Sequence, residues 1–274
     1  HAALAAAGRI NPQKVSPRVT DCETTMTRVQ ENSLSIRKKS DMNILPNTNL
    51  NLSPLSLGTA NYGTGIEEAT AFALLDHYAK LGGNVLDTAN VYGKWGAEKT
   101  NTSEQIIGKW LKANHNRGDI ILCSKGCHYN MDTPQLPRLS PEAFQKDLQE
   151  SMETLGVDCI DLFYLHRDDP NVPADVVVDM LHEAMENGLV RHVGVSNWTA
   201  ERIEAAEAYA QKQYGKTPFF TADQMMWNLA VPNKAEPAGP GTLAMDDDLL
   251  AFHQRTGMAI FAYSAQAQGY FSKA

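Results

Sequence analysis

The chain has 274 residues, of which 43% are hydrophobic and 20% are charged. This is the composition of an ordinary globular protein, and the length suits one large domain or two small ones. The net charge of −8 argues against a nucleic-acid partner, which usually meets a basic surface. No apolar run approaches the roughly 18 residues of a membrane span, so we expect no membrane partner.

The start of the chain and its cysteines bear on where the protein works. The first residues, HAALAAAGRI, show neither a signal-peptide pattern nor an initiator methionine, which suggests a processed product or a fragment. The four cysteines (Cys22, Cys123, Cys127 and Cys159) are not spaced as metal ligands. We interpret them as reduced thiols in a cytoplasmic protein without a metal site.

Residues 1–50 differ from the rest of the chain. They contain the helix-prone segment AALAAA, a short amphipathic segment capped by Thr20 or Asp21, and the polar stretch IRKKSDMNILPNTNLN. We interpret this region as an N-terminal appendage or a fragment of another domain, partly helical. The main domain is then predicted over residues 51–274.

From residue 52 onward, short apolar runs alternate with segments of helical periodicity. The predicted strands are 54–60, 84–88, 120–125, 160–166, 192–197, 219–225 and 259–264. The predicted helices are 67–82, 102–115, 140–156, 175–188, 200–215 and 247–257. Several helices carry boundary signals, such as the Ser140-Pro141 start and the glycine Gly156 at the end of the same helix.

Continuous apolar strands separated by helices predict a parallel sheet. The strands recur in a regular βα order, which fits either a doubly wound sheet or a (β/α)8 barrel. No GxGxxG follows the first strand, and this weakens the doubly wound, dinucleotide-binding alternative. Seven strands in uninterrupted βα order favour the α/β fold class of the (β/α)8 TIM barrel.

Polar residues stand at the same end of six successive predicted strands. They are Asp87, Lys125, His166, Asn197, Gln224, and Tyr263 with Ser264. In a barrel these ends meet at one mouth, so we expect the side chains to converge there. We predict that Asp87 pairs with Lys125 and that the ammonium lowers the pKa of Tyr92. A histidine at the same mouth would orient a carbonyl oxygen, with the phenol as general acid.

Five segments resemble the aldo-keto reductase family in that family's order and spacing. They are NVLDTANVYG, SKG, YLHRDD, VGVSNW and AYSAQAQG, and the resemblance runs over residues 57–269. It implies a barrel that reduces aldehydes or ketones with a nicotinamide cofactor, usually NADPH, with NADH as the alternative. The partner would be a small carbonyl compound.

The resemblance also implies roles for individual residues. A catalytic tetrad would comprise Asp87, Tyr92, Lys125 and His166, with Tyr92 as the proton donor. Ser196, Asn197 and Gln224 would hold the carboxamide of the nicotinamide, and Tyr263 would stack on its ring. Cofactor contacts would continue through Ser264, Gln266 and Gly269, which would approach the pyrophosphate.

The family barrel has an eighth strand and helix, and its terminal segment holds the adenosine 2′-phosphate. This chain ends at Ala274, just after the seventh predicted strand. We therefore expect a barrel without its last strand and helix, most simply because the sequence is incomplete. The alternatives are a strand supplied by residues 1–50 or by another chain, and a defective fragment. The preference for NADPH rests on the resemblance alone.

Aromatic and charged residues after the strand ends suggest the substrate class. Trp95, Trp198 and Trp227 follow strand ends near the predicted mouth, and Arg167 follows His166. We predict that Trp95, Arg167 and Trp227 bind a polar, sugar-like carbonyl compound. The alternative is that the indoles pack against loops or the cofactor.

Two other functions stay open. One is a regulatory or scaffold protein on the same barrel, as the potassium-channel β subunits are, which binds the cofactor with little turnover. The other is a metal-dependent barrel hydrolase, for which only His166 and Asp87 stand at strand ends as ligands. The complete tetrad favours the reductase.

Overall fold

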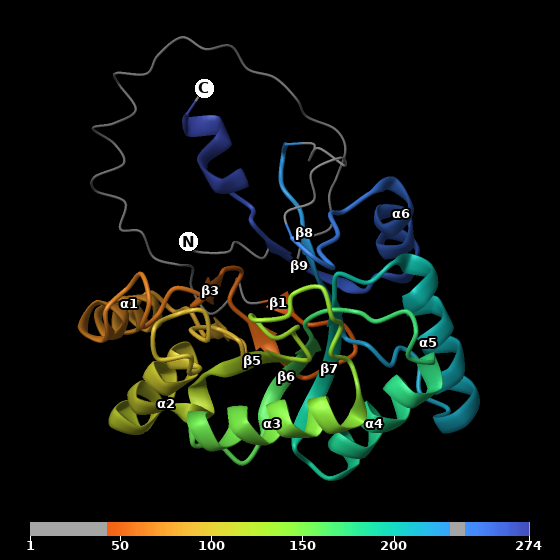
Figure 1. The fold of residues 1–274 in the computed structure, drawn as a ribbon, viewed down its shortest axis with the longest axis horizontal. Coiled ribbons are helices and arrows are strands. Elements are labelled where there is room, and N and C mark those ends of the chain that lie inside the picture. Colours follow the sequence, from red (N-terminus) through yellow and green to blue (C-terminus); the bar gives the residue numbers. More distant parts are fainter. Residues whose placement is uncertain (1–42, 231–238, 274) are drawn as a thin grey trace.

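A seven-stranded parallel sheet forms the centre of the computed structural model, which describes residues 43–230 and 239–273. The strands follow one another in chain order and are β3 (Ser56–Gly58), β4 (Val85–Asp87), β5 (Ile121–Gly126), β6 (Ile160–Leu165), β7 (Val190–Ser196), β8 (Ala222–Met226) and β9 (Ala259–Tyr263). The helices between them are α1 (Glu68–Lys80), α2 (Thr102–Asn114), α3 (Pro141–Leu155), α4 (Ala174–Glu186), α5 (Ala200–Tyr214) and α6 (Asp247–Thr256). They lie in an arc outside the sheet (Figure 1).

The curled sheet is a half-barrel of the (β/α)8 type without its last elements. Each strand pairs in parallel with the next, and β3 and β9 form the two edges among the described residues. The seven predicted strands and six predicted helices are all present, so the predicted fold class is confirmed. A short 3-10 helix, η3 (Ala267–Ser272), follows β9.

Local signals set the helix ends as the sequence predicts. The hydroxyl of Ser140 accepts a hydrogen bond from the backbone N–H of Ala143 at 3.1 Å, and Pro141 occupies the first turn of α3. At the other end, Gly156 takes the left-handed conformation with φ of 67°, which glycine adopts without a steric penalty. Local chemistry and tertiary packing therefore agree on where α3 begins and ends.

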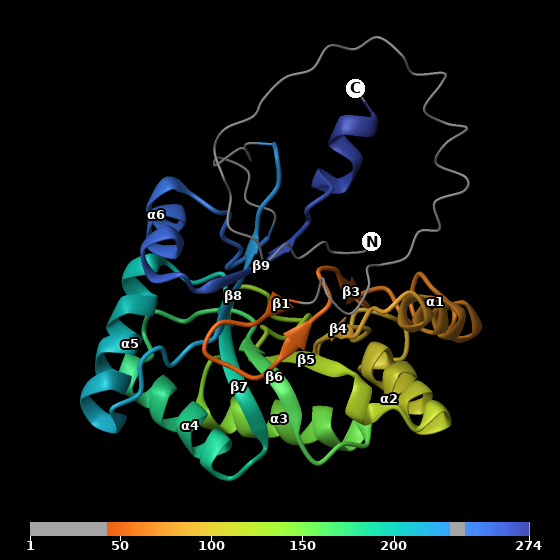
Figure 2. The same ribbon diagram turned by 180° about the vertical axis from the view of Figure 1, so that it is seen from behind.

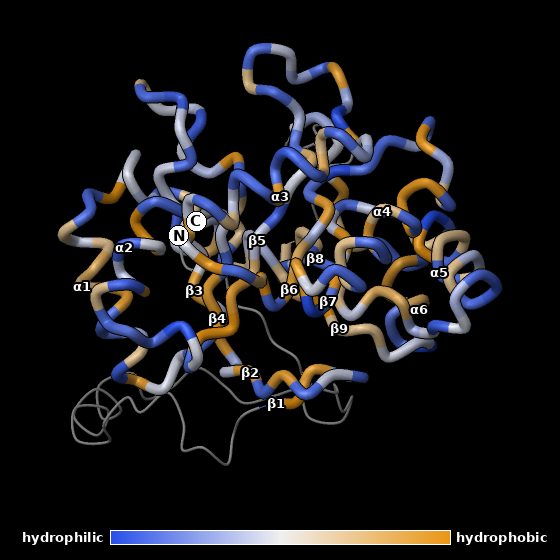
Figure 3. Tube along the Cα trace, turned by 90° about the horizontal axis from the view of Figure 1, so that it is seen from below, coloured by the Kyte–Doolittle hydropathy of each residue, from blue (hydrophilic) through white to orange (hydrophobic). Residues whose placement is uncertain are grey.

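Two apolar clusters hold the half-barrel together. The larger lies between the outer face of the sheet and the helices, with Phe163 and Leu165 of β6 among its members. The smaller fills the inside of the curl, where Leu162 and Tyr164 of β6 alternate with them. Figure 3 shows the hydrophobic stretches gathered along the central strands. No helix in the described part of the chain is long and apolar enough to cross a membrane.

A β-hairpin of β1 (Asn43–Ile44) and β2 (Asn51–Leu52) lies across the end of the sheet where the strands begin (Figure 2). Leu45, Leu50 and Leu52 are buried there with the first residues of the strands. The side-chain amide of Asn84, just before β4, donates to the carbonyl of Asn51 at 2.8 Å.

This hairpin bears on the predicted domain division. The predicted boundary between residues 50 and 51 falls inside the hairpin. Residues 43–50 pack with the barrel and close its end at the N-terminal ends of the strands, opposite the predicted mouth. The helical segments predicted earlier in the appendage, and Cys22, lie in residues 1–42, outside the described residues.

A buried carboxyl group lies behind the sheet between α2 and β5. Glu104 is fully buried, and it accepts hydrogen bonds from the hydroxyl of Ser124 at 2.6 Å and from the amide of Asn101 at 2.7 Å. Burial raises the pKa of Glu104 to about 7, although these hydrogen bonds oppose the rise. Because Ser124 precedes Lys125 on β5, the group supports the strand that carries the ammonium.

We expect Glu104 to make the fold less stable as the pH rises from about 4.5 to 7. The folded chain keeps the proton that the unfolded chain releases, so the free energy of unfolding falls by about 3 kcal/mol over this window. A Glu104→Gln variant lacks this contribution. Urea unfolding at both ends of the window should show its stability, relative to the original chain, improving at the higher pH. Parallel pH profiles for the two proteins would contradict the assignment.

Candidate active site

The centre of the site is a buried ion pair between two neighbouring strands. Asp87 is in register with Cys123, so Lys125, two residues further along β5, points into the same interior. Its Nζ lies 2.9 Å from Oδ1 of Asp87 and donates to the carbonyl of Thr88 at 2.6 Å. The predicted pairing of Asp87 with Lys125 is therefore present.

Lys125 is fully buried and keeps its charge. Burial alone would lower the pKa of its ammonium, but the carboxylate of Asp87 and the phenol of Tyr92 outweigh burial and raise the pKa. The amide of Gln224 also donates to Oδ1 of Asp87 at 2.8 Å, which satisfies the carboxylate further. A buried ion pair with all these hydrogen bonds is tolerated in a protein interior.

The turn after β4 returns Tyr92 to the ammonium. Lys125 Nζ donates to the phenolic oxygen of Tyr92 at 3.1 Å and lies 4.6 Å from the centre of its ring. The next residue, Gly93, has φ of 105°, and a Cβ there would collide with the hydroxyl of Thr102. Glycine is therefore required for the turn that holds the phenol over the strand ends.

The Lys125 ammonium lowers the pKa of Tyr92 as predicted, but burial has the larger effect and the net pKa is raised. Burial raises the pKa of Tyr92 above its ordinary value, and the attraction of the Lys125 ammonium opposes this without overcoming it. Tyr92 is therefore a neutral phenol at physiological pH, with the proton that a general acid must hold. The ammonium is placed to stabilise a phenolate once the proton has left.

His166 follows β6 and faces Tyr92. The centres of the two rings are 5.8 Å apart in an edge-to-face arrangement. Burial lowers the pKa of His166 well below its ordinary value, and nearby His128 and Arg167 act in the same direction. The imidazole is therefore neutral, and its buried Nδ1 has no hydrogen-bond partner in the described structure. A neutral imidazole can donate one hydrogen bond to a carbonyl oxygen.

Amide and hydroxyl groups line the ends of β7 and β8 beside this cluster. The hydroxyl of Ser196 donates to the carbonyl of Gln224 at 2.8 Å, and the amide of Asn197 donates to that hydroxyl at 2.9 Å. The same amide donates to the carbonyl of His166 at 3.2 Å. The structure thus brings Ser196, Asn197 and Gln224 together next to Asp87, as the sequence predicts.

Tyr263 joins this group from the end of β9. Its hydroxyl donates to Oδ1 of Asn197 at 2.7 Å, so an aromatic face lies beside the amide cluster. Ser264 follows with φ of 53°, and its carbonyl accepts hydrogen bonds from Asn228 and Ala267. The last two predicted cofactor residues are Gln266 and Gly269. Gln266 is exposed and directly precedes η3, and Gly269 lies within it. Their contacts with a cofactor stay predictions.

The three predicted substrate residues differ in their surroundings, and their roles stay predictions. Trp95 is 42% exposed and its ring lies edge-on to Tyr92, with centres 5.9 Å apart. The guanidinium of Arg167 donates to the carbonyl of His166 at 2.8 Å. The backbone N–H of Trp227 donates to the carbonyl of Tyr263 at 3.3 Å.

Trp198 differs from the expectation that it borders the mouth. It is fully buried and packs edge-to-face on Phe220, with Arg202 over its ring at 4.9 Å. Trp198 therefore packs inside the fold against Phe220 and Arg202 and does not border the mouth. The support that three tryptophans gave to a sugar-like substrate is reduced accordingly.

Other groups at the site are not apparent from strand ends alone. His128 lies in the loop after β5, and its ring contacts that of His166 with centres 4.6 Å apart. The backbone N–H of Leu243 donates to Oδ1 of Asn197 at 3.1 Å. Within residues 43–230 and 239–273, no three or more His, Cys, Asp or Glu side chains are grouped to hold a metal ion.

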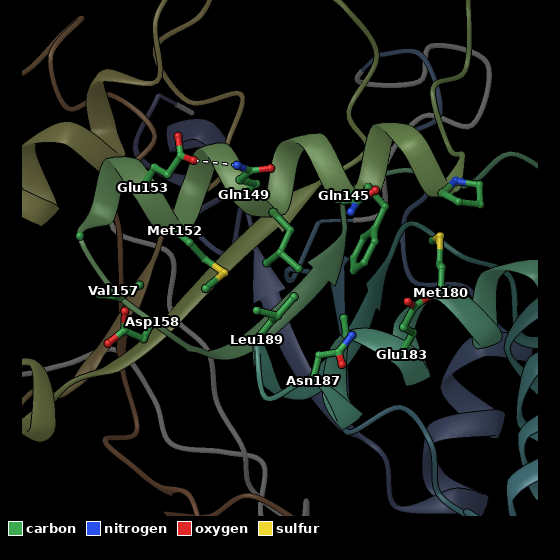
Figure 4. A pocket seen from close by; sticks show the side chains of 15 residues that line it. Gln145, Gln149, Met152, Glu153, Val157, Asp158, Met180, Glu183, Asn187 and Leu189 are labelled. Atoms are coloured by element: carbon green, nitrogen blue, oxygen red, sulfur yellow. Dashed lines mark hydrogen bonds between the residues drawn. The ribbon is translucent and has the colours of Figure 1, made fainter.

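A cavity of about 560 Å³ opens beside Lys125. Val91, Trp95, His128 and Tyr129 are among the residues that line it, so it begins at the polar cluster and extends over the loops after β4 and β5. Another hollow, of about 580 Å³, lies between α3 and α4 on the outside of the barrel (Figure 4). Its walls include Met152, Met180 and Leu189, and none of the predicted site residues lines it.

Comparison with known proteins identifies the family. The sequence profile of the aldo/keto reductase family matches residues 54–274. The chain belongs to this family, in agreement with the resemblance of its motifs.

Individual relatives agree with this assignment. An aldo-keto reductase of Aspergillus calidoustus is 30% identical over 240 residues, which cover 82% of this chain and 56% of that protein. An aryl-alcohol dehydrogenase [NADP(+)] of Phanerodontia chrysosporium is 29% identical over 244 residues, covering 82% of this chain and 58% of that protein. The chain thus spans about half the length of these curated relatives.

A solved structure shows the same fold. The crystal structure of a proposed 2,5-diketo-D-gluconic acid reductase B superposes with a TM-score of 0.63 at 23% sequence identity. The match covers 86% of this chain and 70% of that chain. At this level of identity the comparison concerns the fold, which is the predicted barrel.

Proposed function

We propose that this chain carries the active site of an NADPH-dependent reductase of aldehydes or ketones. The observation that carries the proposal is the position of Lys125, whose single ammonium bonds both the carboxylate of Asp87 and the phenol of Tyr92. This arrangement holds a protonated phenol beside a fixed positive charge at the mouth of the barrel. A carbonyl reductase needs such a proton donor.

Each residue of the tetrad has a separate part in the proposed reaction. The carbonyl oxygen accepts hydrogen bonds from Tyr92 and from the neutral imidazole of His166. A nicotinamide cofactor, when bound, would supply the hydride that the carbonyl carbon accepts, and the phenol of Tyr92 would give its proton to the oxygen, so the product would be an alcohol. The phenolate left on Tyr92 is stabilised by Lys125 and regains its proton from solvent.

The residues beside the tetrad fit a nicotinamide. Tyr263 offers an aromatic face that its hydrogen bond to Asn197 holds in place. Oε1 of Gln224 has no partner in the described residues, so it can accept a hydrogen bond from a carboxamide, while Ser196 and Asn197 offer further polar atoms. The preference for NADPH over NADH is supported by the names of relatives such as the aryl-alcohol dehydrogenase [NADP(+)].

The exposed indole of Trp95 supports an aromatic or other flat substrate. It forms an apolar wall next to Tyr92, and one relative is named an aryl-alcohol dehydrogenase. Sugar-like carbonyl compounds, the class predicted from the sequence, form the comparison set because Arg167 also borders the site. The two classes are separated by assay.

We expect the purified chain to oxidise NADPH when an aromatic aldehyde is present. Steady-state kinetics with benzaldehyde, an aliphatic aldehyde and a sugar aldehyde should give the highest kcat/KM for benzaldehyde. Fluorescence titration of NADPH measures cofactor binding separately. Cofactor binding without turnover of any carbonyl compound would contradict the reductase and favour the regulatory protein on the same barrel.

A further inference from the structure

His128 is a buried histidine at the site for which the proposed reaction has no use. It lies three residues after Lys125 and lines the cavity that opens beside the ammonium. Only 8% of the residue is exposed. Its ring packs edge-to-face on His166, with an angle of 63° between the planes. His128 therefore stands one imidazole away from the place proposed for the carbonyl group.

The hydrogen bonds of His128 fix which nitrogen carries the proton. Nδ1 lies 2.9 Å from the backbone carbonyl oxygen of Tyr129. A carbonyl oxygen can only accept, so Nδ1 is the protonated nitrogen. Nε2 carries no proton and the ring is neutral, because burial and the nearby guanidinium of Arg167 lower the pKa of His128 to about 4. Arg138 and Lys125 face the same ring and act in the same direction.

Nε2 of His128 is consequently a bare acceptor. It makes no hydrogen bond to any residue in the described part of the chain. The atom is accessible from the cavity rather than fully buried, so a ligand that covers it must donate a hydrogen bond in place of the one that solvent offers. A group that hydrogen-bonds to Nε2 must be a donor, as a hydroxyl is. An ether oxygen or a carboxylate has no hydrogen to donate, so its lone pairs would face the lone pair of Nε2.

The aromatic side chains around the cavity indicate which kind of substrate would carry that hydroxyl. Trp95 supplies an exposed indole face on the Tyr92 side of the cavity, and Tyr129 packs over His128 with ring centres 3.9 Å apart. A flat aromatic ring suits the space between such walls. Because His128 contacts His166, an aromatic ring whose carbonyl group bonds Tyr92 and His166 would bring a ring substituent near His128.

We propose that Nε2 of His128 accepts a hydrogen bond from a ring hydroxyl of the substrate, so that the site selects hydroxylated aromatic carbonyl compounds. This specificity rests on the proposed reductase function, whose catalytic groups are separate from it. His128 touches neither the transferred proton nor the cofactor in this scheme. Its effect should therefore appear mainly in KM, as expected for an interaction made equally in the ground state and the transition state.

The test compares meta-hydroxybenzaldehyde with meta-methoxybenzaldehyde as substrates of the full chain. The two substituents perturb the carbonyl group almost equally, but only the hydroxyl can donate a hydrogen bond. The original chain should prefer the hydroxyl compound in kcat/KM by about five- to tenfold, the effect of one net hydrogen bond. A His128→Phe variant, which keeps a ring against His166, should lose this preference.

Two further variants separate recognition from folding. His128→Gln places an amide oxygen near the position of Nε2 and should keep part of the preference. His77→Gln removes an exposed imidazole on α1 and should change nothing. If the original chain shows no preference, or if His128→Phe retains it, the role of His128 is overturned.

These assays distinguish failure of the His128 proposal from failure of the proposed reductase function. Reduction of both aldehydes without discrimination overturns only the role of His128. If neither aldehyde is reduced, the reductase fails, and calorimetric titration of the corresponding meta-substituted benzyl alcohols then measures the same preference as binding. Equal affinity of the original chain for the two alcohols would overturn the role of His128 as well.

Discussion

A Tyr92→Phe variant is expected to reduce aldehydes with a kcat lower than that of the original chain by about 10²- to 10⁴-fold. This is the usual contribution of a positioned general acid, and the substitution removes only the hydroxyl that Lys125 contacts at 3.1 Å. NADPH binding should stay within about twofold, because the phenol is assigned to the carbonyl group rather than to the cofactor. Stopped-flow measurement of NADPH oxidation gives the rate of the chemical step directly.

A second tyrosine provides the matched control. The hydroxyl of Tyr209 bonds Asp179 on the outer surface between α4 and α5, so Tyr209→Phe removes the same atom far from the site. Its kcat should equal that of the original chain. Equal rates for Tyr92→Phe and Tyr209→Phe would show that another group donates the proton.

Replacing Lys125 by Met should lower the free energy of unfolding by about 3–5 kcal/mol. The substitution leaves the carboxylate of Asp87, itself only 6% exposed, without its cation in the interior of the barrel. Hydrogen bonding from Gln224 offsets this only in part. Urea unfolding followed by circular dichroism measures the change.

The double variant Asp87→Asn with Lys125→Met distinguishes loss of the pair from loss of packing. With both charges removed, no isolated carboxylate stays buried, so we expect the double variant to be more stable than Lys125→Met alone. Reductase activity should be lost in both. Strictly additive effects of the two substitutions would contradict a coupled ion pair.

Sequence periodicity was sufficient for the half-barrel because local and tertiary preferences agree there. Buried strands such as β6 carry an unbroken apolar pattern, and glycines such as Gly156 mark the helix ends. The hairpin of β1 and β2 escaped prediction for the opposite reason. Its strands have two residues each, and its stability comes from burying leucines such as Leu45 against the barrel, which a local pattern does not show.

The candidate site was predictable where chemistry follows strand ends, and less so elsewhere. Asp87 and Lys125 meet because neighbouring parallel strands place them on the same face. The balance between burial and charge that sets the pKa of Tyr92 depends on how deeply the whole cluster lies, which the sequence does not give. His128 was missed because its loop position carries no periodicity, although a histidine three residues after the lysine is a usable signal.

The central claim is that the Tyr92 and Lys125 pair serves direct hydride transfer from a nicotinamide to a carbonyl carbon. The most direct measurement uses NADPH carrying deuterium at both transferable positions of its dihydronicotinamide, with benzaldehyde as substrate and mass spectrometry of the alcohol. We predict one deuterium on the alcohol carbon, formed far more slowly by the Tyr92→Phe variant. An alcohol without deuterium, or no alcohol from a chain that binds NADPH, would contradict the claim.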